Sequence, residues 1–276
     1  MPRESNGLFV VGAGSMAEAF LRGVTATSTV TPGDIYVMNR SNEERRTRLC
    51  AEYGVEAGQD ASRVKTARVV IIACKPADVH AAMEPLLPYL HRHQVLVSFA
   101  AGMPMAYLRE ITDGAVPVIR TMPNLPVAVS AGATAVSIAD DVPQAEAEYV
   151  LHLLRQLGAV VSLPESLMDA ATAFSGSGPG FVCYFLEAME AAAQKLGFDA
   201  LTARELLLDT VIGTARVLQE WGLSPEELRR RVTSPGGTTH AGVTSMAEDE
   251  MPAVVERGLC AAAARSKEMG SVYAVR

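Results

Sequence analysis

Short apolar runs alternate with longer amphipathic segments through the first half of the chain. Segments with helical spacing lie at Met16–Val24, Glu43–Tyr53 and Val79–Tyr89. The runs with the character of buried strands are Leu8–Val11, Ile35–Met38, Val69–Ala73, Val95–Phe99 and Val116–Ile119, with Gly132–Ile138 and Ala159–Ser162 as candidates to extend the sheet. This alternation predicts an α/β fold built on a doubly wound parallel sheet.

The pattern changes near Leu163–Glu165, and from Met168 onward helices alone are predicted. Phe181–Ala193 and Glu205–Trp221 are apolar over more of their surface than one core-facing stripe needs, so another surface has to cover them. We therefore predict two domains, a sheet domain over residues 1–164 and an all-helical dimerisation domain over residues 165–276. A bundle that covers these faces within one chain is the alternative.

Two pairs of residues in the second half match the spacing of a helix capping box. They are Thr202 with Glu205, and Ser224 with Glu227. In the second pair, Pro225 also takes the favoured first helical position. Each pair predicts the start of a helix.

Composition and charge narrow the class of protein. The net charge of −7 gives no general reason to bind nucleic acid or an anionic membrane. The four cysteines lack the spacing of a disulfide framework or a zinc site, and the five histidines suggest no metal cluster. No run approaches the roughly 18–20 apolar residues of a membrane span, and the first residues do not resemble a signal peptide. We expect a cytoplasmic enzyme with no metal.

A glycine turn follows the first predicted strand. Gly12, Ala13, Gly14, Ser15, Met16 and Ala17 fit the pattern G-x-G-x-x-G/A between a strand and a helix. The first glycine permits a tight turn, and the second lets the backbone approach a pyrophosphate. The helix N-terminus supplies unpaired N–H groups for the phosphates. The turn predicts a Rossmann domain that binds a dinucleotide.

The end of the second predicted strand bears on the choice of cofactor. A site for NAD usually places a carboxylate there, to accept from the ribose 2′-hydroxyl. Here the strand is followed by Asn39, Arg40 and Ser41, and Arg40 can pair with a 2′-phosphate. This favours NADP(H), with NAD(H) as the alternative and an ordinary surface arginine as the explanation that needs no ligand.

The ends of the next two strands carry small residues. Open α/β sheets bind ligands at the carboxyl ends of their strands. We therefore place the cofactor beside these two segments, although Cys74 is better interpreted as a packing residue than as a nucleophile. The residues concerned are Ala73, Cys74, Lys75 and Pro76, then Ala100, Ala101 and Gly102.

A second dense motif lies between two predicted helices. It runs from Thr233 to His240 and contains Ser234, Pro235, Gly236, Gly237, Thr238 and Thr239. Glycines and hydroxyls before a helix make a cradle of backbone N–H donors that suits a small carboxylate. A tight interhelical turn with ordinary capping is the alternative.

These motifs together resemble one family over the whole chain, the pyrroline-5-carboxylate reductases. The matching segments are Gly12–Ala17, Ala73–Pro76, Ala100–Gly102, Arg120–Asn124, Asp169–Pro179 and Val232–Thr239. The last two are highly specific in combination, whereas many dehydrogenases share the first.

The resemblance implies reduction of the cyclic imine 1-pyrroline-5-carboxylate to L-proline by NAD(P)H, the last step of proline biosynthesis. It implies a C-terminal helical dimerisation domain, a homodimer or a ring of dimers, and sites that combine the Rossmann domain of one subunit with helices of its partner. It implies that Glu165 and Ser234–Thr239 bind the substrate, that the loop amides hold its carboxylate, and that the Thr239 hydroxyl contacts the ring nitrogen.

The chain also departs from the family pattern. The departures are Leu125 where threonine is common, Gly180 where alanine is usual, Asp60 where asparagine often contacts the cofactor, and His240 where an apolar residue is common. They bear on substrate detail, and His240 is a candidate proton donor, although a hydrogen-bonded turn histidine is favoured. The alternatives are another imine reductase, an enzyme like the β-hydroxyacid dehydrogenases, and a non-enzymatic or regulatory relative. Lys195 is the one lysine in Met168–Arg265, at a helix end that suits a solvated charge rather than a catalytic base.

Overall fold

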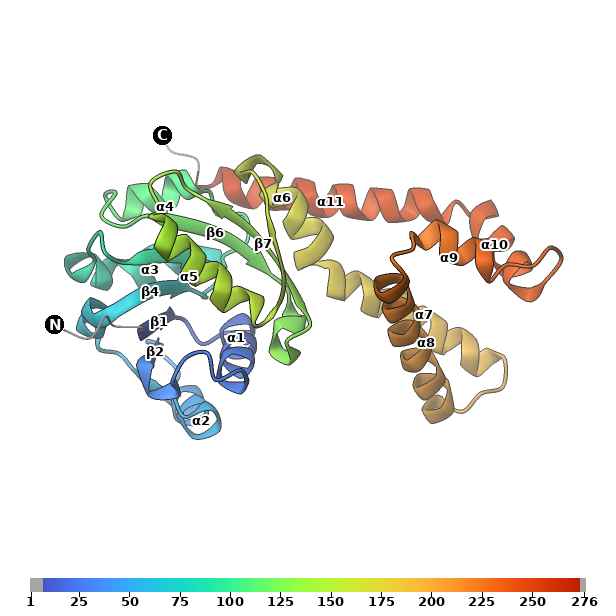
Figure 1. Cartoon of the computed structure of the whole chain (residues 1–276), viewed down its shortest axis with the longest axis horizontal. Helices are drawn as coiled ribbons and strands as arrows, with labels where there is room; N and C mark the ends of the chain where they lie inside the picture. Colours follow the sequence, from blue (N-terminus) through green and yellow to red (C-terminus); the bar gives the residue numbers. More distant parts are fainter. Residues whose placement is uncertain (1–6, 274–276) are drawn as a thin grey trace. The chain divides into compact units, whose positions relative to one another are not determined.

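The computed structural model describes residues 7–273 (Figure 1). The chain forms two compact units. The sheet unit comprises Met1–Pro179 and Ala261–Arg276, and the helical unit comprises Gly180–Cys260. Residues 165–179 group with the sheet, because Met168 and Ala171 form a small buried cluster with Ala135. The predicted domain boundary between residues 164 and 165 stays a prediction, since the two compact units are defined by contacts and not by segments of sequence.

The sheet unit is built on a mostly parallel sheet, as predicted. In the described residues it has eight strands in the order β3-β2-β1-β4-β5-β6-β7-β8, and its first six have the strand order of a Rossmann fold. β7 runs antiparallel to β6, whereas all other neighbours are parallel. The strands are β1 Gly7–Val11, β2 Ile35–Met38, β3 Glu56–Gly58, β4 Ala67–Ile72, β5 Val95–Ser98, β6 Val118–Pro123, β7 Gly132–Ile138 and β8 Gly158–Ser162.

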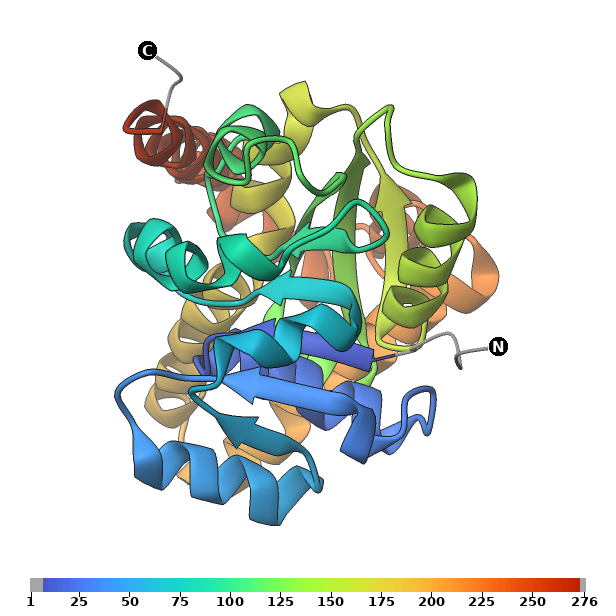
Figure 2. The ribbon, with the colours of Figure 1, turned by 90° about the vertical axis from the view of Figure 1, so that its left-hand side faces the viewer.

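Helices cover both faces of the sheet (Figure 2). Alternate residues of β1 enter two different clusters, with Leu8 and Val10 in one and Phe9 and Val11 in the other. α1, α2 and α5 pack on the first face, and α3 and α4 on the second. These helices are α1 Ser15–Ala26, α2 Glu43–Tyr53, α3 Val79–Met83, α4 Met105–Ile111 and α5 Gln144–Arg155.

The prediction of one helix over Val79–Tyr89 is only half right. α3 ends at Met83, and a 3₁₀ segment covers Glu84–Tyr89. Pro85 and Pro88 explain the change, because proline lacks an N–H and clashes with the preceding helical turn.

The second half is helical, as predicted. A short helix α6, Met168–Ala171, leads through one π turn, Thr172–Gly176, into the next helix. Both α7 and α11 cross the boundary between the units. The long helices are α7 Gly178–Lys195, α8 Ala200–Trp221, α9 Pro225–Arg231, α10 Thr238–Glu248 and α11 Met251–Ser271.

Of the two predicted capping boxes, one forms. Ser224 Oγ accepts from the backbone N–H of Glu227, and the Glu227 carboxylate accepts from the N–H of Ser224. The prediction for Thr202 is wrong, because Asp199 is the N-cap of α8 and accepts from the N–H groups of Leu201 and Thr202. Aspartate is preferred over threonine as an N-cap, and Asp199 lies three residues before Thr202.

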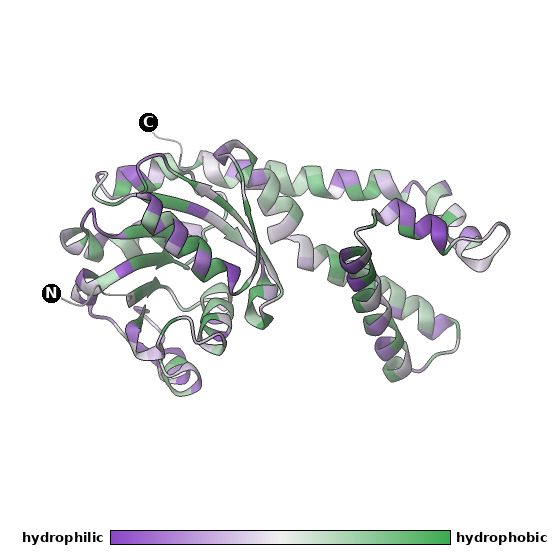
Figure 3. Ribbon diagram, viewed as in Figure 1, coloured by the Kyte–Doolittle hydropathy of each residue, from purple (hydrophilic) through white to green (hydrophobic). Residues whose placement is uncertain are grey.

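The helical unit leaves much apolar side-chain surface uncovered. Its helices carry many hydrophobic residues, which are green in Figure 3. None of the residues of α7 is buried in the single chain, and α8 buries only Ala203 and Leu207. Large exposed side chains on these two helices include Phe181, Phe185, Leu201, Leu206, Ile212 and Trp221. The alternative of a bundle that covers these faces itself is therefore wrong. Nowhere in residues 7–273 is a helix both long and apolar enough to cross a membrane.

Candidate cofactor cleft and substrate loop

An open cleft of about 840 Å³ lies in the sheet unit, at the carboxyl ends of β1, β2 and β4. Ten of the residues predicted to bind the cofactor line it: Gly12, Ala13, Gly14, Ser15, Met16, Asn39, Arg40, Ala73, Cys74 and Lys75. Pro76, Ala100, Ala101 and Gly102 are not among the residues that line it. Side chains that the sequence analysis did not single out also line it, among them Asn42, Arg45, Gln59 and Asp78.

The glycine turn has the geometry that a pyrophosphate needs. Gly12 has a φ of +105°, and a Cβ there would lie 2.9 Å from the backbone nitrogen of Cys74. Gly14 is the N-cap of α1 and supplies no capping side chain, so the first N–H groups of that helix face the cleft uncapped. Ala17 is fully buried between helix and sheet. This part of the chain fits the phosphates of a dinucleotide.

Side chains fix the backbone at the end of β2. The carbonyl of Asn39 accepts from Arg46 Nη1 at 2.6 Å, and the carbonyl of Arg40 accepts from Gln59 Nε2 at 2.9 Å. Asn39 Oδ1 accepts from the N–H of Ser41. With the backbone fixed in this way, the Arg40 side chain remains exposed at the cleft, where it suits a phosphate.

Arg45 is a lining residue that the sequence analysis missed. Its position in the first turn of α2 gives it the pattern of an ordinary surface charge. Asn42 accepts from the backbone N–H of Arg45 at 2.8 Å and so fixes where α2 begins. The short distance in sequence between the end of β2 and the start of α2 could have indicated this position. A helix that starts just after a strand places its first residues at the carboxyl edge of the sheet.

Cys74 lies in the cleft as a packing residue. Burial raises the pKa of its thiol to about 11, and the nearby Asp78 acts in the same direction. Near neutral pH the thiol is therefore protonated and a poor nucleophile. This agrees with the interpretation from the sequence.

Gly102 is required by helix packing in the sheet unit. Its φ is +69°, and a Cβ there would lie 2.8 Å from the backbone oxygen of Ser266 in α11. A Cβ on Gly270 would in turn lie 2.5 Å from the backbone oxygen of Gly102. Two glycines thus let α11 pack directly on the loop that follows β5.

Glu165 belongs to a network around Arg120, a buried residue of β6 with 4% of its surface exposed. Glu165 Oε1 accepts from the N–H of Met105 at 2.6 Å, at the start of α4, and lies 3.4 Å from Arg120 Nη1. Arg120 Nη2 also donates to Asp169 at 3.1 Å. In the structure the carboxylate of Glu165 therefore caps a helix and neutralises a buried cation.

The predicted substrate loop lies in the helical unit, between α9 and α10. Gly236 has a φ of +73°, and the N–H of Gly237 donates to the carbonyl of Ser234 at 3.0 Å, which closes a turn. Gly237 is the N-cap of α10 and has no capping side chain. The first N–H groups of α10, beginning with Thr238 and Thr239, can therefore serve an external acceptor such as a carboxylate.

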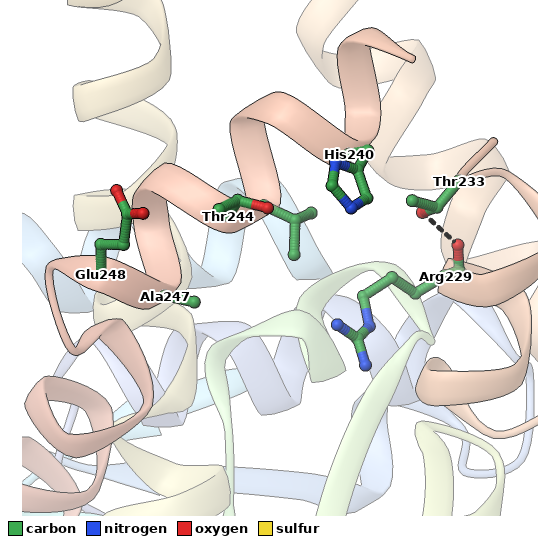
Figure 4. Close-up of a pocket in the computed structure, with 7 residues that line it drawn as sticks. Arg229, Thr233, His240, Thr244, Ala247 and Glu248 are labelled. Carbon is green, nitrogen blue, oxygen red and sulfur yellow. Dashed lines mark hydrogen bonds between the residues drawn. The ribbon is translucent and has the colours of Figure 1, made fainter. Parts of the chain in front are cut away.

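His240 lines a separate groove of about 480 Å³ between α9 and α10 (Figure 4). Its ring is turned toward Arg229 and Thr233, and Thr244 follows one helical turn later. None of the residues from Ser234 to Thr239 lines this groove. His240 is the third residue of α10 and not part of a turn, so its interpretation as a turn histidine is wrong, and its role as a proton donor stays a prediction.

The Rossmann strand order, the glycine turn and the helical second half define a nicotinamide-dependent oxidoreductase with a helical dimerisation segment. Two family models match the chain. "NADP oxidoreductase coenzyme F420-dependent" matches residues 8–102, and "Pyrroline-5-carboxylate reductase dimerisation" matches residues 165–269.

Relatives match over almost the full length. Pyrroline-5-carboxylate reductase 2 of Bacillus subtilis is 36% identical over 265 residues, which is 96% of this chain and 95% of the relative. The reductase of Staphylococcus saprophyticus is 32% identical over 96% and 98% of the two chains. The solved structure of a pyrroline-5-carboxylate reductase from Coxiella burnetii superimposes with a TM-score of 0.87 at 31% identity, over 97% of this chain and 99% of that one. The chain belongs to the pyrroline-5-carboxylate reductase family.

Proposed function

We propose that the protein reduces 1-pyrroline-5-carboxylate to L-proline with NADPH. The observation that carries this proposal is the full-length match to reductases of this name, together with an intact glycine turn and an intact substrate loop. The reaction is the last step of proline biosynthesis. NADH remains an alternative hydride donor. A preference for NADPH over NADH has to come from the arginine side chains at the cleft, which can bind the 2′-phosphate.

For the cofactor, we propose that the N–H groups of Gly12–Met16 hold the pyrophosphate and that Asn39 and Arg40 face the 2′-phosphate. The uncapped start of α1 and the exposed Arg40 side chain support these roles. We propose that Ala73–Pro76 and Ala100–Gly102 flank the nicotinamide. Ala73, Cys74 and Lys75 line the cleft, which supports the role of the first segment. In the second segment, Gly102 packs against α11.

For the substrate, we propose that the amides of Ser234–Thr239 hold the carboxylate, with Gly236, Gly237 and Thr238 shaping the cradle. The uncapped N-terminus of α10 supports this role. The Thr239 hydroxyl is proposed to contact the ring nitrogen. Glu165 is kept as a proposed substrate ligand through its second carboxylate oxygen, since the first is bound to the N–H of Met105.

When NADPH is bound along Gly12–Met16, it would provide the hydride that reduces C5 of the imine. The chain contributes orientation, because fixing the carboxylate sets the ring in one pose and removes the freedom that otherwise raises the barrier. The ring nitrogen has to carry a proton at or before transfer. The Thr239 hydroxyl can stabilise the changing charge on that nitrogen but supplies no net proton. The substrate therefore arrives as the iminium ion, or water relays the proton.

The direct test follows the loss of reduced-nicotinamide absorbance with 1-pyrroline-5-carboxylate, with NADPH and NADH in parallel. Turnover that is faster with NADPH supports both the reaction and the cofactor. Turnover that favours NADH keeps the reaction and removes the role of Arg40. A protein that binds NADPH but reduces none of this substrate would point to a different imine.

We also propose that the protein is a cytoplasmic homodimer, or a ring of dimers, joined through α7 and α8. The uncovered apolar side chains of these helices and the match to the dimerisation model support this proposal. Sedimentation equilibrium of wild type and of Ile212→Glu tests it. A wild-type protein that sediments as a monomer would exclude the dimer.

A further inference from the structure

One buried donor in the cofactor cleft has no acceptor. Within residues 7–273, Nε of Arg45 is the buried side-chain nitrogen or oxygen that lacks a hydrogen-bond partner. Buried polar groups in proteins are almost always paired, so the Arg45 guanidinium has hydrogen-bonding capacity that the described chain does not use. Arg45 lines the same cleft as Arg40.

The Arg45 guanidinium is already oriented by a carboxylate. Its Nη2 donates to Oε2 of Glu18, in the first turn of α1, at 2.7 Å. Arg48 donates to the same oxygen at 2.7 Å, but it is half-exposed and does not line the cleft. Glu18 occupies one nitrogen of the planar Arg45 fork and leaves the remaining N–H groups for a second acceptor.

The charge at this end of the cleft matches a phosphate monoester. Arg40 and Arg45 both line this end of the cleft, and the Glu18 carboxylate beside Arg45 is shared with Arg48, which lies outside the cleft. A phosphate monoester carries about −1.5 to −2 near neutral pH. The one acidic residue that lines the cleft, Asp78, follows β4 and not β2.

We infer that Arg45 is a second ligand of the 2′-phosphate of NADPH and that Glu18 positions it. This inference rests on the proposed NADPH-dependent function. Cofactor preference then depends on two guanidinium groups, the exposed one of Arg40 and the preoriented one of Arg45. A guanidinium already held in place loses less conformational entropy when it binds a phosphate.

The test measures cofactor binding directly, by titrating nicotinamide fluorescence with NADPH and with NADH on the full chain. Arg45→Gln is expected to raise the Kd for NADPH about 10- to 100-fold, the range for one charge-assisted hydrogen-bonded pair, and to change the Kd for NADH by less than about threefold. Arg45→Lys restores the charge but not the fork, so an intermediate loss is expected. Glu18→Gln is expected to lower the NADPH preference by a smaller factor, because it frees the guanidinium without removing it.

Arg48→Gln is the matched control, since Arg48 shares the helix and the Glu18 oxygen but not the cleft. We expect its NADPH affinity to change by less than about threefold. Competition of adenosine 2′,5′-bisphosphate and of ADP with bound NADPH repeats the comparison, because these two nucleotides lack nicotinamide and only the first carries a 2′-phosphate. An unchanged NADPH-to-NADH ratio in Arg45→Gln, or an equal loss in Arg48→Gln, overturns the inference. Absent turnover with preserved NADPH selectivity would instead count against the proposed reaction alone.

Discussion

Ser266 in α11 donates a hydrogen bond of 2.8 Å to Asp169, which lies 97 residues earlier in α6. Asp169 also accepts from the buried Arg120 of β6. One carboxylate thus fastens the C-terminal helix and the start of the helical half to the sheet.

Replacing Asp169 by alanine is expected to lower the free energy of unfolding by about 2–4 kcal/mol, because Arg120 then loses one of its two carboxylates in a buried setting. Urea denaturation measures the loss. Arg265→Ala in α11, next to the Ser266 that binds Asp169, is the control, since the Arg265–Glu268 pair is exposed and a change below about 0.5 kcal/mol is expected there. Equal losses of unfolding free energy in the two variants would show that the buried network around Arg120 stabilises the fold no more than an exposed ion pair does.

Gly12→Ala is expected to abolish tight binding of NADPH and to lower stability by about 1–3 kcal/mol. The Cβ would be forced against the backbone of Ala73 and Cys74, at a φ that disfavours L-residues. Gly33→Ala is the matched control, because a Cβ there meets nothing within 4 Å. Thermal melts with and without NADPH separate the two effects. Retained NADPH affinity in Gly12→Ala would contradict the role of the turn.

Cys74 is expected to resist alkylation until strongly alkaline pH, whereas the exposed Cys260 reacts first. Burial raises the pKa of the Cys74 thiol from its ordinary value of 9.0 to about 11. Because the folded-state pKa is the higher one, this group favours the folded state below pH 9, and its contribution is lost as the pH rises from 9 toward 11. Mass spectrometry of iodoacetamide-treated protein between pH 7 and 10 measures the order in which the cysteines are alkylated. Rapid labelling of Cys74 at pH 7 would contradict the prediction.

Thr239→Val is expected to lower kcat/KM for 1-pyrroline-5-carboxylate about 10- to 100-fold, with the Kd for NADPH unchanged, because only the proposed contact to the ring nitrogen is lost. Thr244→Val is the control further along α10, in the groove beside His240, and there we expect full activity. A Thr239→Val enzyme as fast as wild type would remove the hydroxyl from the mechanism.

The sequence predicts most of this sheet because its strands are short, apolar and buried, as in Val69–Ala73. It misses β3, because Glu56–Gly58 is too short and too polar to show a period. It does not predict that β7 runs antiparallel to β6, since strand direction depends on a connection whose path is not local. It places two segments beside the cofactor, yet the packing of α11 on Gly102 becomes visible only in three dimensions.

The candidate site shows the same division. The glycine turn and Arg40 are readable because backbone conformation and charge follow directly from local residue types. Arg45 is not, since its importance arises from one unpaired nitrogen and from Glu18 on another helix. Glu165 was assigned by resemblance alone, and its bond to the N–H of Met105 could not be inferred from spacing.

The sheet unit is interrupted in the chain, because residues 180–260 intervene before Ala261–Ser271 returns to it. On the ribosome, the contact between Gly102 and Gly270 therefore has to wait until the apolar helices α7 and α8 have already been made. The nascent chain therefore exposes the apolar side chains of these helices before its sheet unit is complete. Under the proposed dimerisation through these helices, pairing with a second copy and completion of the sheet unit become concurrent steps of assembly.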